Sequence, residues 1–424
     1  MAVKFGIIAD DFTGASDIAS FLNLSGAKTI LVNEIPENNS FDYSSYDAIV
    51  IALKSRSIDK KDAIQYTERS YELFKSNKVE NVYFKYASTF DSTTDGNIGP
   101  VADYLLEKTG QKYSLLVPSF PDNNRVVKEG ILYVDEKKIE DTHMSKHPLN
   151  PMTESRLVTL IESQSKYKAL NISIENIIYF LKNREEFSHY LLDLSSKYEH
   201  FYIIPDYYEN HHGKLIAELF NDLEVYTGAS VFGGWIYQIK NNKITNEYPT
   251  LPKLNLADNF RADTGLVLAG SLSKATRLQV ETFKNKNYPF YEIKNEKIYN
   301  DYDLVLEEIK KFILSNKNKV MLIHTEDRKF DKTIDDLLEN IISDSAVFAL
   351  NNDIDKIVVA GGETSGAVVT NIDTNNFQIG PSISPGVPIL MAIEKDKKSK
   401  LVLKSGNFGN EDFFEEALYL MGEI

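Results

Sequence analysis

The chain has 424 residues, with 47 basic and 62 acidic side chains, a net charge of −15 and no cysteine. The acidic balance disfavours polyanionic partners, so we expect neither nucleic acid nor an anionic membrane surface. The lack of cysteine excludes disulfides, a thiolate nucleophile and Cys-ligated zinc. Because the sequence shows no signal-peptide pattern and no apolar run of about 20 residues, we expect a cytoplasmic protein of two or three domains.

Short apolar runs alternate with amphipathic patterns through the first half of the chain. We expect strands at residues 3–9, 29–32, 48–53, 82–86, 115–118 and 201–204, and helices at 15–24, 60–75, 100–108 and 214–220. Apolar strands separated by helices are typical of a parallel sheet covered on both faces. Such a sheet binds ligands at the carboxyl ends of its strands.

A polar stretch at 240–259, with Pro249 and Pro252, predicts a linker. Beyond it, strands are expected at 264–269, 320–324, 356–360 and 400–403. We therefore predict an α/β protein of two α/β domains, at 1–240 and 263–424, joined by a linker at 241–262. Both domains should have largely parallel sheets, with an active-site cleft between them.

Two adjacent carboxylates, Asp10 and Asp11, follow the first predicted strand. They could act as a general base or as Mg²⁺ ligands. The alternative is structural, since an Asp, or Thr13, could cap the helix that follows.

A second polar loop follows the strand at 82–86 and contains Ser88, Thr89, Asp91, Asn97 and Gly99. Pro100 marks the start of a helix behind this loop. The N–H groups of a helix N-terminus suit a carboxylate or a phosphate, although an elaborately capped loop would have the same composition.

Arg125 follows the strand predicted at 115–118 and is one of few arginines in a lysine-rich chain. Its guanidinium suits two-point binding of a carboxylate, and a surface ion pair is the alternative. His147 is a weaker candidate, since a lone histidine is more often structural.

Three glycine-bearing loops follow strands in the second half, at 270–274, 361–366 and 404–409. Glycine allows the close backbone approach with which successive N–H groups surround phosphate oxygens. Together the loops favour a nucleotide phosphate site. The chain has no GxxxxGK[ST] motif, and no GxGxxG follows the first strand, so a P-loop nucleotidase and a Rossmann dehydrogenase are disfavoured.

Taken in order, these segments closely resemble the four-carbon acid sugar kinase family, whose members have a sugar-acid-binding and a nucleotide-binding domain. The likeness covers nearly the whole chain. It is carried by IADDFTGASDIASFL at 8–22, STFDSTTDGNIGPV at 88–101, PSFPDNNRVV at 118–127, HPLNPMTES at 147–155, LAGSLSKAT at 268–276, VAGGETSGAVV at 359–369, SPGVP at 384–388 and LKSGNFGNEDFF at 403–414.

The resemblance implies an ATP-dependent kinase that phosphorylates the terminal C4 hydroxyl of a four-carbon sugar acid. The segments at 88–101 and 147–155 are similar to the branch that acts on 3-oxo-tetronates, which implies 3-dehydro-erythronate as the substrate. A D-threonate or D-erythronate kinase of the same family stays the alternative. Those kinases carry a KxDSTLRGN/H-type loop at this place, whereas here Phe90 precedes Asp91 and no Arg follows the Ser-Thr pair. A non-catalytic sensor of sugar acid and nucleotide is the alternative from another class.

The resemblance also implies roles for single residues. ATP would bind, with Mg²⁺ bridging its phosphates, at Ser271, Gly361, Gly362, Glu363, Thr364 and Gly406. Asp10 or Asp11, or failing them Asp91, would accept the hydroxyl proton. The substrate carboxylate would lie at Arg125 and the Gly99 helix end, in a site that includes Ser88, Thr89, Asn97 and His147. The protein ligands of the metal and a homo-oligomeric state stay open.

Overall fold

The computed structural model describes residues 4–36, 41–147, 150–243, 261–327, 331–372, 374–393 and 399–424. The chain divides into two compact units, Met1–Thr250 and Leu251–Ile424. Their boundary falls in the predicted linker, of which residues 244–260 lie outside the described residues. No helix in the described ranges has the length and apolar character needed to cross a membrane.

The first unit contains a parallel sheet in the order β11-β4-β1-β3-β2. Its strands are β1 (Phe5–Ala9), β2 (Thr29–Asn33), β3 (Ala48–Ala52), β4 (Asn81–Lys85) and β11 (Val225–Gly228). Every residue of these strands is buried, as expected for a parallel sheet covered on both faces. The predicted strands at 3–9, 29–32, 48–53 and 82–86 are thereby confirmed.

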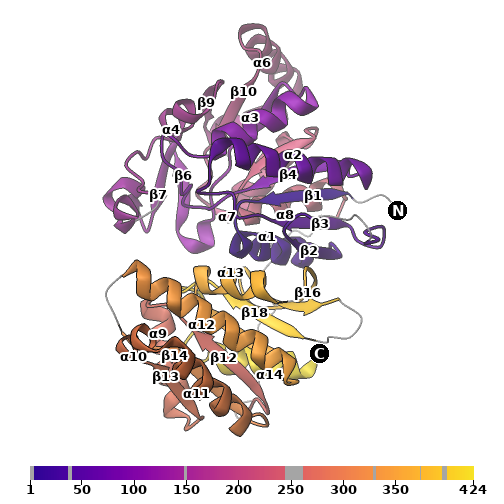
Figure 1. The fold of residues 1–424 in the computed structure, drawn as a ribbon. Coiled ribbons are helices and arrows are strands. Elements are labelled where there is room, and N and C mark those ends of the chain that lie inside the picture. The colour runs from indigo at the N-terminus through magenta and orange to yellow at the C-terminus, as the bar shows by residue number, and fades with distance from the viewer. Residues whose placement is uncertain are drawn as a thin grey trace. The chain divides into compact units, whose positions relative to one another are not determined.

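Helices cover both faces of this sheet (Figure 1). A Cβ on Gly6 would meet Phe74 of α2, whereas a Cβ on Gly233 of α8 would meet Ile18 of α1 and the ring of Tyr83. The Cβ position of Gly6 and the side chain of Tyr83 point to opposite faces of the sheet, because Tyr83 pairs with Ile7, the residue after Gly6. Helix α2 therefore covers one face, and α8 covers the other. The helices of this unit are α1 (Phe12–Leu24), α2 (Lys60–Ser76), α3 (Ile98–Thr109), α4 (Leu157–Gln164), α5 (Ile174–Lys182), α6 (Arg184–Lys197), α7 (Asn210–Leu219) and α8 (Ser230–Lys240).

Two smaller sheets complete the first unit. One is parallel, in the order β5-β10-β9, with β5 (Tyr113–Leu115), β9 (Lys168–Ile172) and β10 (Phe201–Pro205). The other is antiparallel, with β6 (Arg125–Lys128), β7 (Ile131–Val134) and β8 (Lys137–Lys138), and was not predicted. The 3₁₀ helices η1 (Pro121–Asn123), η2 (Ile139–Asp141) and η3 (His143–Lys146) flank it.

The strand predicted at 115–118 was misplaced, because the chain changes sheets there. The Leu116 N–H still donates to Ile203 of β10, at 3.0 Å, but the Val117 N–H donates to Thr227 of β11, at 3.2 Å. Pro118 has no N–H with which to continue a ladder.

The second unit has a sheet in the order β16-β17-β18-β15-β12-β14-β13. It is parallel from β18 to β13 and antiparallel where β16, β17 and β18 pair. The strands are β12 (Gly265–Ala269), β13 (Phe290–Ile293), β14 (Val320–Thr325), β15 (Lys356–Ala360), β16 (Asn376–Ser384), β17 (Val387–Ala392) and β18 (Lys400–Lys404). The helices are α9 (Lys274–Asn285), α10 (Asn295–Asn300), α11 (Tyr302–Ser315), α12 (Lys332–Asn351), α13 (Gly362–Asn371) and α14 (Phe413–Glu423). The largely parallel α/β prediction is confirmed for both units.

Candidate active site

Three loops at the carboxyl ends of neighbouring strands form the polar site of the first unit. β1 pairs with β3 on one side and with β4 on the other, and all three strands run parallel. Asp10 and Asp11 follow β1, Arg56 follows β3, and Asp91 lies in the loop after β4. The structure thus brings together the three acids that the sequence marked as catalytic candidates.

Arg56 joins the three carboxylates. Its Nε and Nη2 each donate to Asp10 at 2.8 Å, in the bidentate geometry of a strong ion pair. Nη2 also lies 3.0 Å from Asp11 Oδ1, and Nη1 lies 3.3 Å from Asp91 Oδ2. Because one guanidinium bridges the carboxylates, this arrangement favours a charge-balanced network over a Mg²⁺ site shared by the three acids. Arg56 was not among the site residues predicted from the sequence.

Burial and charge oppose each other at this ion pair. Asp10 is 4% exposed, and burial raises the pKa of its carboxyl group, while the Arg56 guanidinium acts to lower it. Burial alone would lower the pKa of Arg56, but the carboxylates of Asp10 and Asp11 raise it above the ordinary value. The buried ammonium group of Lys85 adds a second positive charge close to Asp10. Arg56 therefore stays charged and balances part of the negative charge of the site.

Asp11 both caps a helix and faces solvent. It is the N-cap of α1, and its Oδ1 accepts a hydrogen bond from the Gly14 N–H at 2.8 Å. A Cβ on Gly14 would lie 2.4 Å from this oxygen, so a glycine is needed there. The side chain of Asp11 is 32% exposed, against 5% for Asp10 and 14% for Asp91. Oδ1 of Asp11 therefore caps the helix, as the structural alternative predicted. Oδ2 accepts no hydrogen bond from a described residue and could accept a proton.

The loop after β4 has an unusual backbone at its catalytic candidate. Phe90 and Asp91 have φ angles of 63° and 24°, a region that residues other than glycine rarely adopt. The buried Phe90 ring and a 2.7 Å hydrogen bond from Thr89 Oγ1 to Asp91 Oδ1 hold this conformation. Such backbone conformations persist where the surroundings enforce them, and they cluster at functional sites. Ser88 lies at the start of this loop and is half-buried.

Asn97 and Gly99 have structural contacts in this arrangement. Asn97 Nδ2 donates to the carbonyl oxygens of Ser55 and Ile58, at 2.8 and 2.9 Å, and so fixes the loop that carries Arg56. The Gly99 N–H donates to Gln164 Oε1 at 3.0 Å, and a Cβ on Gly99 would lie 2.6 Å from Gln164 Cβ. The Gly99 helix end is thus covered by α4, contrary to the open anion site expected from the sequence.

Arg125 and His147 lie at the edge of the same site. Arg125 is half-buried and donates from Nη1 to the Asn123 carbonyl oxygen, while its buried Nε has no hydrogen-bond partner among the described residues. Burial lowers the pKa of Arg125, and the nearby carboxylates of Asp135 and Asp91 oppose this shift. His147 Nδ1 accepts the Asn150 N–H at 3.0 Å, which gives it a local structural contact.

The segment that begins at His147 contacts both neighbouring loops. Asn150 Nδ2 donates to Ser57 Oγ, next to Arg56, at 3.0 Å. Met152 Sδ lies 3.3 Å from the Ser92 N–H, in the loop after β4. Residues 148 and 149 lie outside the described residues. A cavity of about 10 Å³, lined by Asp10, Arg56 and Asp91, holds at most about one water and is too small for a sugar acid.

The three glycine loops of the second unit also meet at neighbouring strand ends. They follow β12, β15 and β18, which lie side by side in the order β18-β15-β12. A Cβ on Gly406 would lie 2.2 Å from Ser271 Oγ, and one on Gly361 would lie 2.7 Å from Thr364 Oγ1. Gly361, with φ of 140°, precedes α13, whose first residues are Gly362 and the exposed Glu363. The nucleotide-site residues expected from the sequence therefore form one cluster.

Lys404 is a second residue that the sequence analysis did not single out. It is fully buried at the end of β18, and its Nζ donates to Thr276 Oγ1 at 2.9 Å and to the Gly406 carbonyl oxygen at 3.0 Å. Its own carbonyl oxygen accepts the Gly361 N–H at 2.9 Å. Burial lowers the pKa of Lys404 to about 7. Lys404 thus ties two glycine loops together and places an amine that titrates near neutral pH beside them.

Comparisons with known proteins agree with this division of the chain. Family models of a sugar-binding N-terminal domain and a nucleotide-binding C-terminal domain match residues 5–234 and 266–414. A 3-oxo-tetronate kinase from Haemophilus influenzae is 35% identical, over 97% of this chain and 98% of the relative. The chain belongs to the four-carbon acid sugar kinase family. Another 3-oxo-tetronate kinase, from Actinobacillus succinogenes, is also 35% identical, over 98% of this chain and 99% of that protein.

A solved structure shares the fold over nearly the whole chain. A protein from Salmonella typhimurium LT2 superposes with a TM-score of 0.84 at 32% identity, covering 98% of each chain. In this chain the acid and arginine network lies within the match to the sugar-binding domain. The cluster of glycine loops lies within the match to the nucleotide-binding domain.

Proposed function

We propose that this chain is an ATP-dependent kinase that phosphorylates the terminal C4 hydroxyl of a four-carbon sugar acid, namely 3-dehydro-erythronate, to its 4-phosphate. The observation that carries the proposal is the convergence of Asp10, Asp11 and Asp91 on Arg56 at the strand ends of the sugar-binding domain. Phosphoryl transfer needs positioned groups and balanced charge more than covalent chemistry from the protein. The names of the relatives supply the substrate class.

Asp11 is the proton acceptor that the geometry favours. Both oxygens of Asp10 accept hydrogen bonds from Arg56, and those of Asp91 are engaged by Arg56 and Thr89. Asp11 is the most exposed of the three, and no described residue donates a hydrogen bond to its Oδ2. A base needs a lone pair within reach of the substrate hydroxyl. The Nε of Arg125, which has no hydrogen-bond partner among the described residues, is the donor we propose for the substrate carboxylate.

The second unit offers room for a nucleotide. A cavity of about 490 Å³ adjoins Ser271 and is lined by paired basic and acidic side chains, among them Arg277 with Asp327 at 3.1 Å. This volume lies in the range of small-molecule sites. The phosphates would lie at the N-terminus of α13, where backbone N–H groups and the helix dipole favour an anion.

The residues beside these N–H groups also fit a Mg²⁺ ion. Mg²⁺ binds through one or two carboxylates together with substrate phosphates and water. Two residues next to the proposed phosphate position could supply oxygen ligands for the metal. They are Glu363, which is exposed in the first turn of α13, and Thr364, through its hydroxyl group. When bound, the ion would supply positive charge that offsets the charge of the phosphates.

The substrate assignment predicts a preference that steady-state kinetics can measure. The 3-oxo acid should be turned over with a kcat/KM at least about tenfold above that of D-threonate or D-erythronate, because a site built for a carbonyl leaves polar groups unpaired when it binds an alcohol. An ADP-release assay with the three acids measures the ratio. Equal or faster turnover of a reduced acid would place the chain in the neighbouring branch of the family.

Gly362→Val should weaken ATP binding by at least about tenfold, which corresponds to about 1.4 kcal/mol. A Cβ on Gly362 would meet no atom within 4 Å, so the variant should fold, but its side chain would enter the proposed phosphate position. Gly361 is a poorer test, because its φ of 140° would strain any replacement. Gly366→Val is the matched control, since it too projects into open space, one turn further along α13. Calorimetric ATP titrations in which Gly362→Val binds like wild type would refute the assignment.

Nucleotide affinity should depend on pH through Lys404. Burial lowers the pKa of Lys404 to about 7, so the Lys404 amine is largely uncharged above this pH when no nucleotide is bound. Bound phosphates favour its charged ammonium form. ADP binding should therefore take up a proton, and affinity should fall by up to about tenfold per pH unit between about pH 7.5 and 9. Titrations in buffers of different ionisation enthalpy measure this uptake. The variant Lys404→Met should lose this proton uptake, whereas the control Lys356→Met, on β15, should retain it. Proton uptake that survives in Lys404→Met would contradict the role of Lys404.

A further inference from the structure

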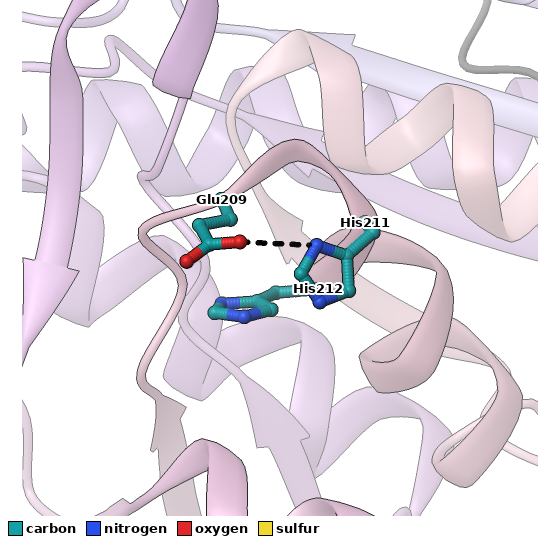
Figure 2. Close-up of side chains that lie close together, drawn as sticks. All are labelled: Glu209, His211 and His212. Carbon is teal, nitrogen blue, oxygen red and sulfur yellow. Dashed lines mark ion pairs between the residues drawn. The ribbon is translucent and has the colours of Figure 1, made fainter.

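The start of α7 brings three side chains with metal-binding atoms together, outside the acid and arginine network. They are Glu209, His211 and His212, and one ligand atom from each lies within 4.8 Å of the other two (Figure 2). His211 Nδ1 lies 3.4 Å from Glu209 Oε2, and the centroids of the two imidazole rings are 4.4 Å apart. Nothing in the proposed kinase reaction uses this cluster.

The cluster combines one fixed and two adjustable side chains. His212 is 4% exposed, and the ring of Tyr208 packs edge-on against it with centroids 4.5 Å apart. The side chains of His211 and Glu209 are 63% and 60% exposed and can shift at little cost. The backbone between them is held, since the His212 N–H donates to the Glu209 carbonyl oxygen at 2.9 Å.

We propose that Glu209, His211 and His212 bind a divalent transition-metal ion of the Zn²⁺ class. Two imidazoles and a carboxylate are the ligands that such ions prefer, whereas Mg²⁺ and Ca²⁺ prefer oxygen alone. Tetrahedral bonds of about 2.1 Å place ligand atoms about 3.4 Å apart, so the two exposed side chains need to move by only about an ångström. Water would take the fourth position.

Surrounding charges and contacts fit a bound cation. The carboxylates of Glu175 and Asp206 lie close enough to act on the charge of His212, and Glu209 supplies a negative charge of its own. These charges offset the positive end of the α7 dipole. His212 Nδ1 accepts only a long, 3.4 Å hydrogen bond from the Tyr208 N–H, which a metal ion could replace.

The ion would stabilise the start of α7 and the loop beside it. Asn210 lies between the proposed ligands, and its Nδ2 donates to Asp122 in the segment that precedes Arg125. Metal binding to the folded state should therefore raise the melting temperature of the protein. Because Asp11, Arg56 and the glycine loops are not involved, turnover with Mg²⁺ and ATP should not require this ion.

The test is a Zn²⁺ titration by calorimetry of the full-length, tag-free protein without nucleotide, with Co²⁺ absorption as a second probe. Wild type should bind one Zn²⁺ per chain at this site. Glu209→Gln and His211→Ala, which change exposed side chains, should each weaken binding by at least about tenfold. His189→Ala, at an exposed histidine of α6, is the control and should bind like wild type. Absence of Zn²⁺ binding in wild type, or unchanged affinity in either ligand variant, would overturn the proposal.

Discussion

Replacing Asp11 by Asn should lower kcat by roughly 10²–10⁴-fold, the usual contribution of a positioned general base, with little change in melting temperature. The amide oxygen of Asn can still accept the Gly14 N–H, and Asn ranks with Asp at helix N-termini. The lost ion pair with Arg56 is partly exposed and contributes little to stability. What the variant loses is the basicity of Oδ2. Steady-state kinetics and thermal melting separate the two effects.

Asp59→Asn is the matched control, because Asp59 caps α2 through a 2.8 Å bond from the Lys61 N–H and lies outside the site. It should leave both kcat and melting temperature near those of wild type. If Asp11→Asn retains near-native kcat, Asp11 serves only as a cap. Asp91 would then be the next proton acceptor to test.

Arg56→Gln should both destabilise the first unit, by about 3 kcal/mol, and lower kcat by about 10²-fold. Removing one partner of a buried ion pair leaves an uncompensated charge, which is strongly destabilising. The side chain of Arg56 is 22% exposed, so we expect the low end of the measured range. The loss of kcat follows because Asp11 and Asp91 would no longer be held in place. Arg56→Lys should rescue little, since an ammonium group cannot reproduce the bidentate contact with Asp10.

The stability loss in Arg56→Gln should grow with pH. Without the guanidinium, burial raises the pKa of Asp10 unopposed by its main partner, whereas the unfolded chain releases this proton near pH 4. The folded state then binds more protons than the unfolded state, so stability falls as pH rises above about 4. Urea unfolding at about pH 5 and pH 8 measures the difference, with the exposed Arg69→Gln as control. A loss that is equal at both pH values would contradict the proposed charge balance.

Sequence patterns predicted the site residues that lie directly after a strand. Asp10 and Asp11 directly follow a strand, and the glycine loops follow β12, β15 and β18. Parallel pairing then brings the ends of such strands together, which explains why Asp91 and Gly406 were identified without knowledge of their neighbours.

Arg56 and the Gly99 helix end show what the sequence could not reveal. The partners of Arg56 in hydrogen bonds lie 46 and 35 residues away, at Asp10 and Asp91, and Gly99 is covered by a glutamine 65 residues away. No local pattern encodes such distant contacts. A signal for Arg56 was nevertheless present, since it is an arginine placed directly after a predicted strand.

The antiparallel sheet of β6, β7 and β8 was missed because its strands are short. Its two connections are two-residue turns, Glu129-Gly130 and Asp135-Glu136, in which all four residues have φ between 49° and 70°. These are the mirror-image turns that match the twist of a hairpin. Glu-Gly was a usable turn signal, but Asp-Glu was not, because neither residue favours positive φ strongly.

The most direct test of the proposed function is product analysis after incubation with ATP, Mg²⁺ and 3-dehydro-erythronate. ADP release and ³¹P NMR spectroscopy should show one ADP formed for each acid consumed and a single phosphate monoester at C4. The contrary result is binding of both ATP and the acid without any release of ADP, for 3-dehydro-erythronate and for every other four-carbon acid tried. That result would contradict the kinase assignment and identify the protein as a sensor.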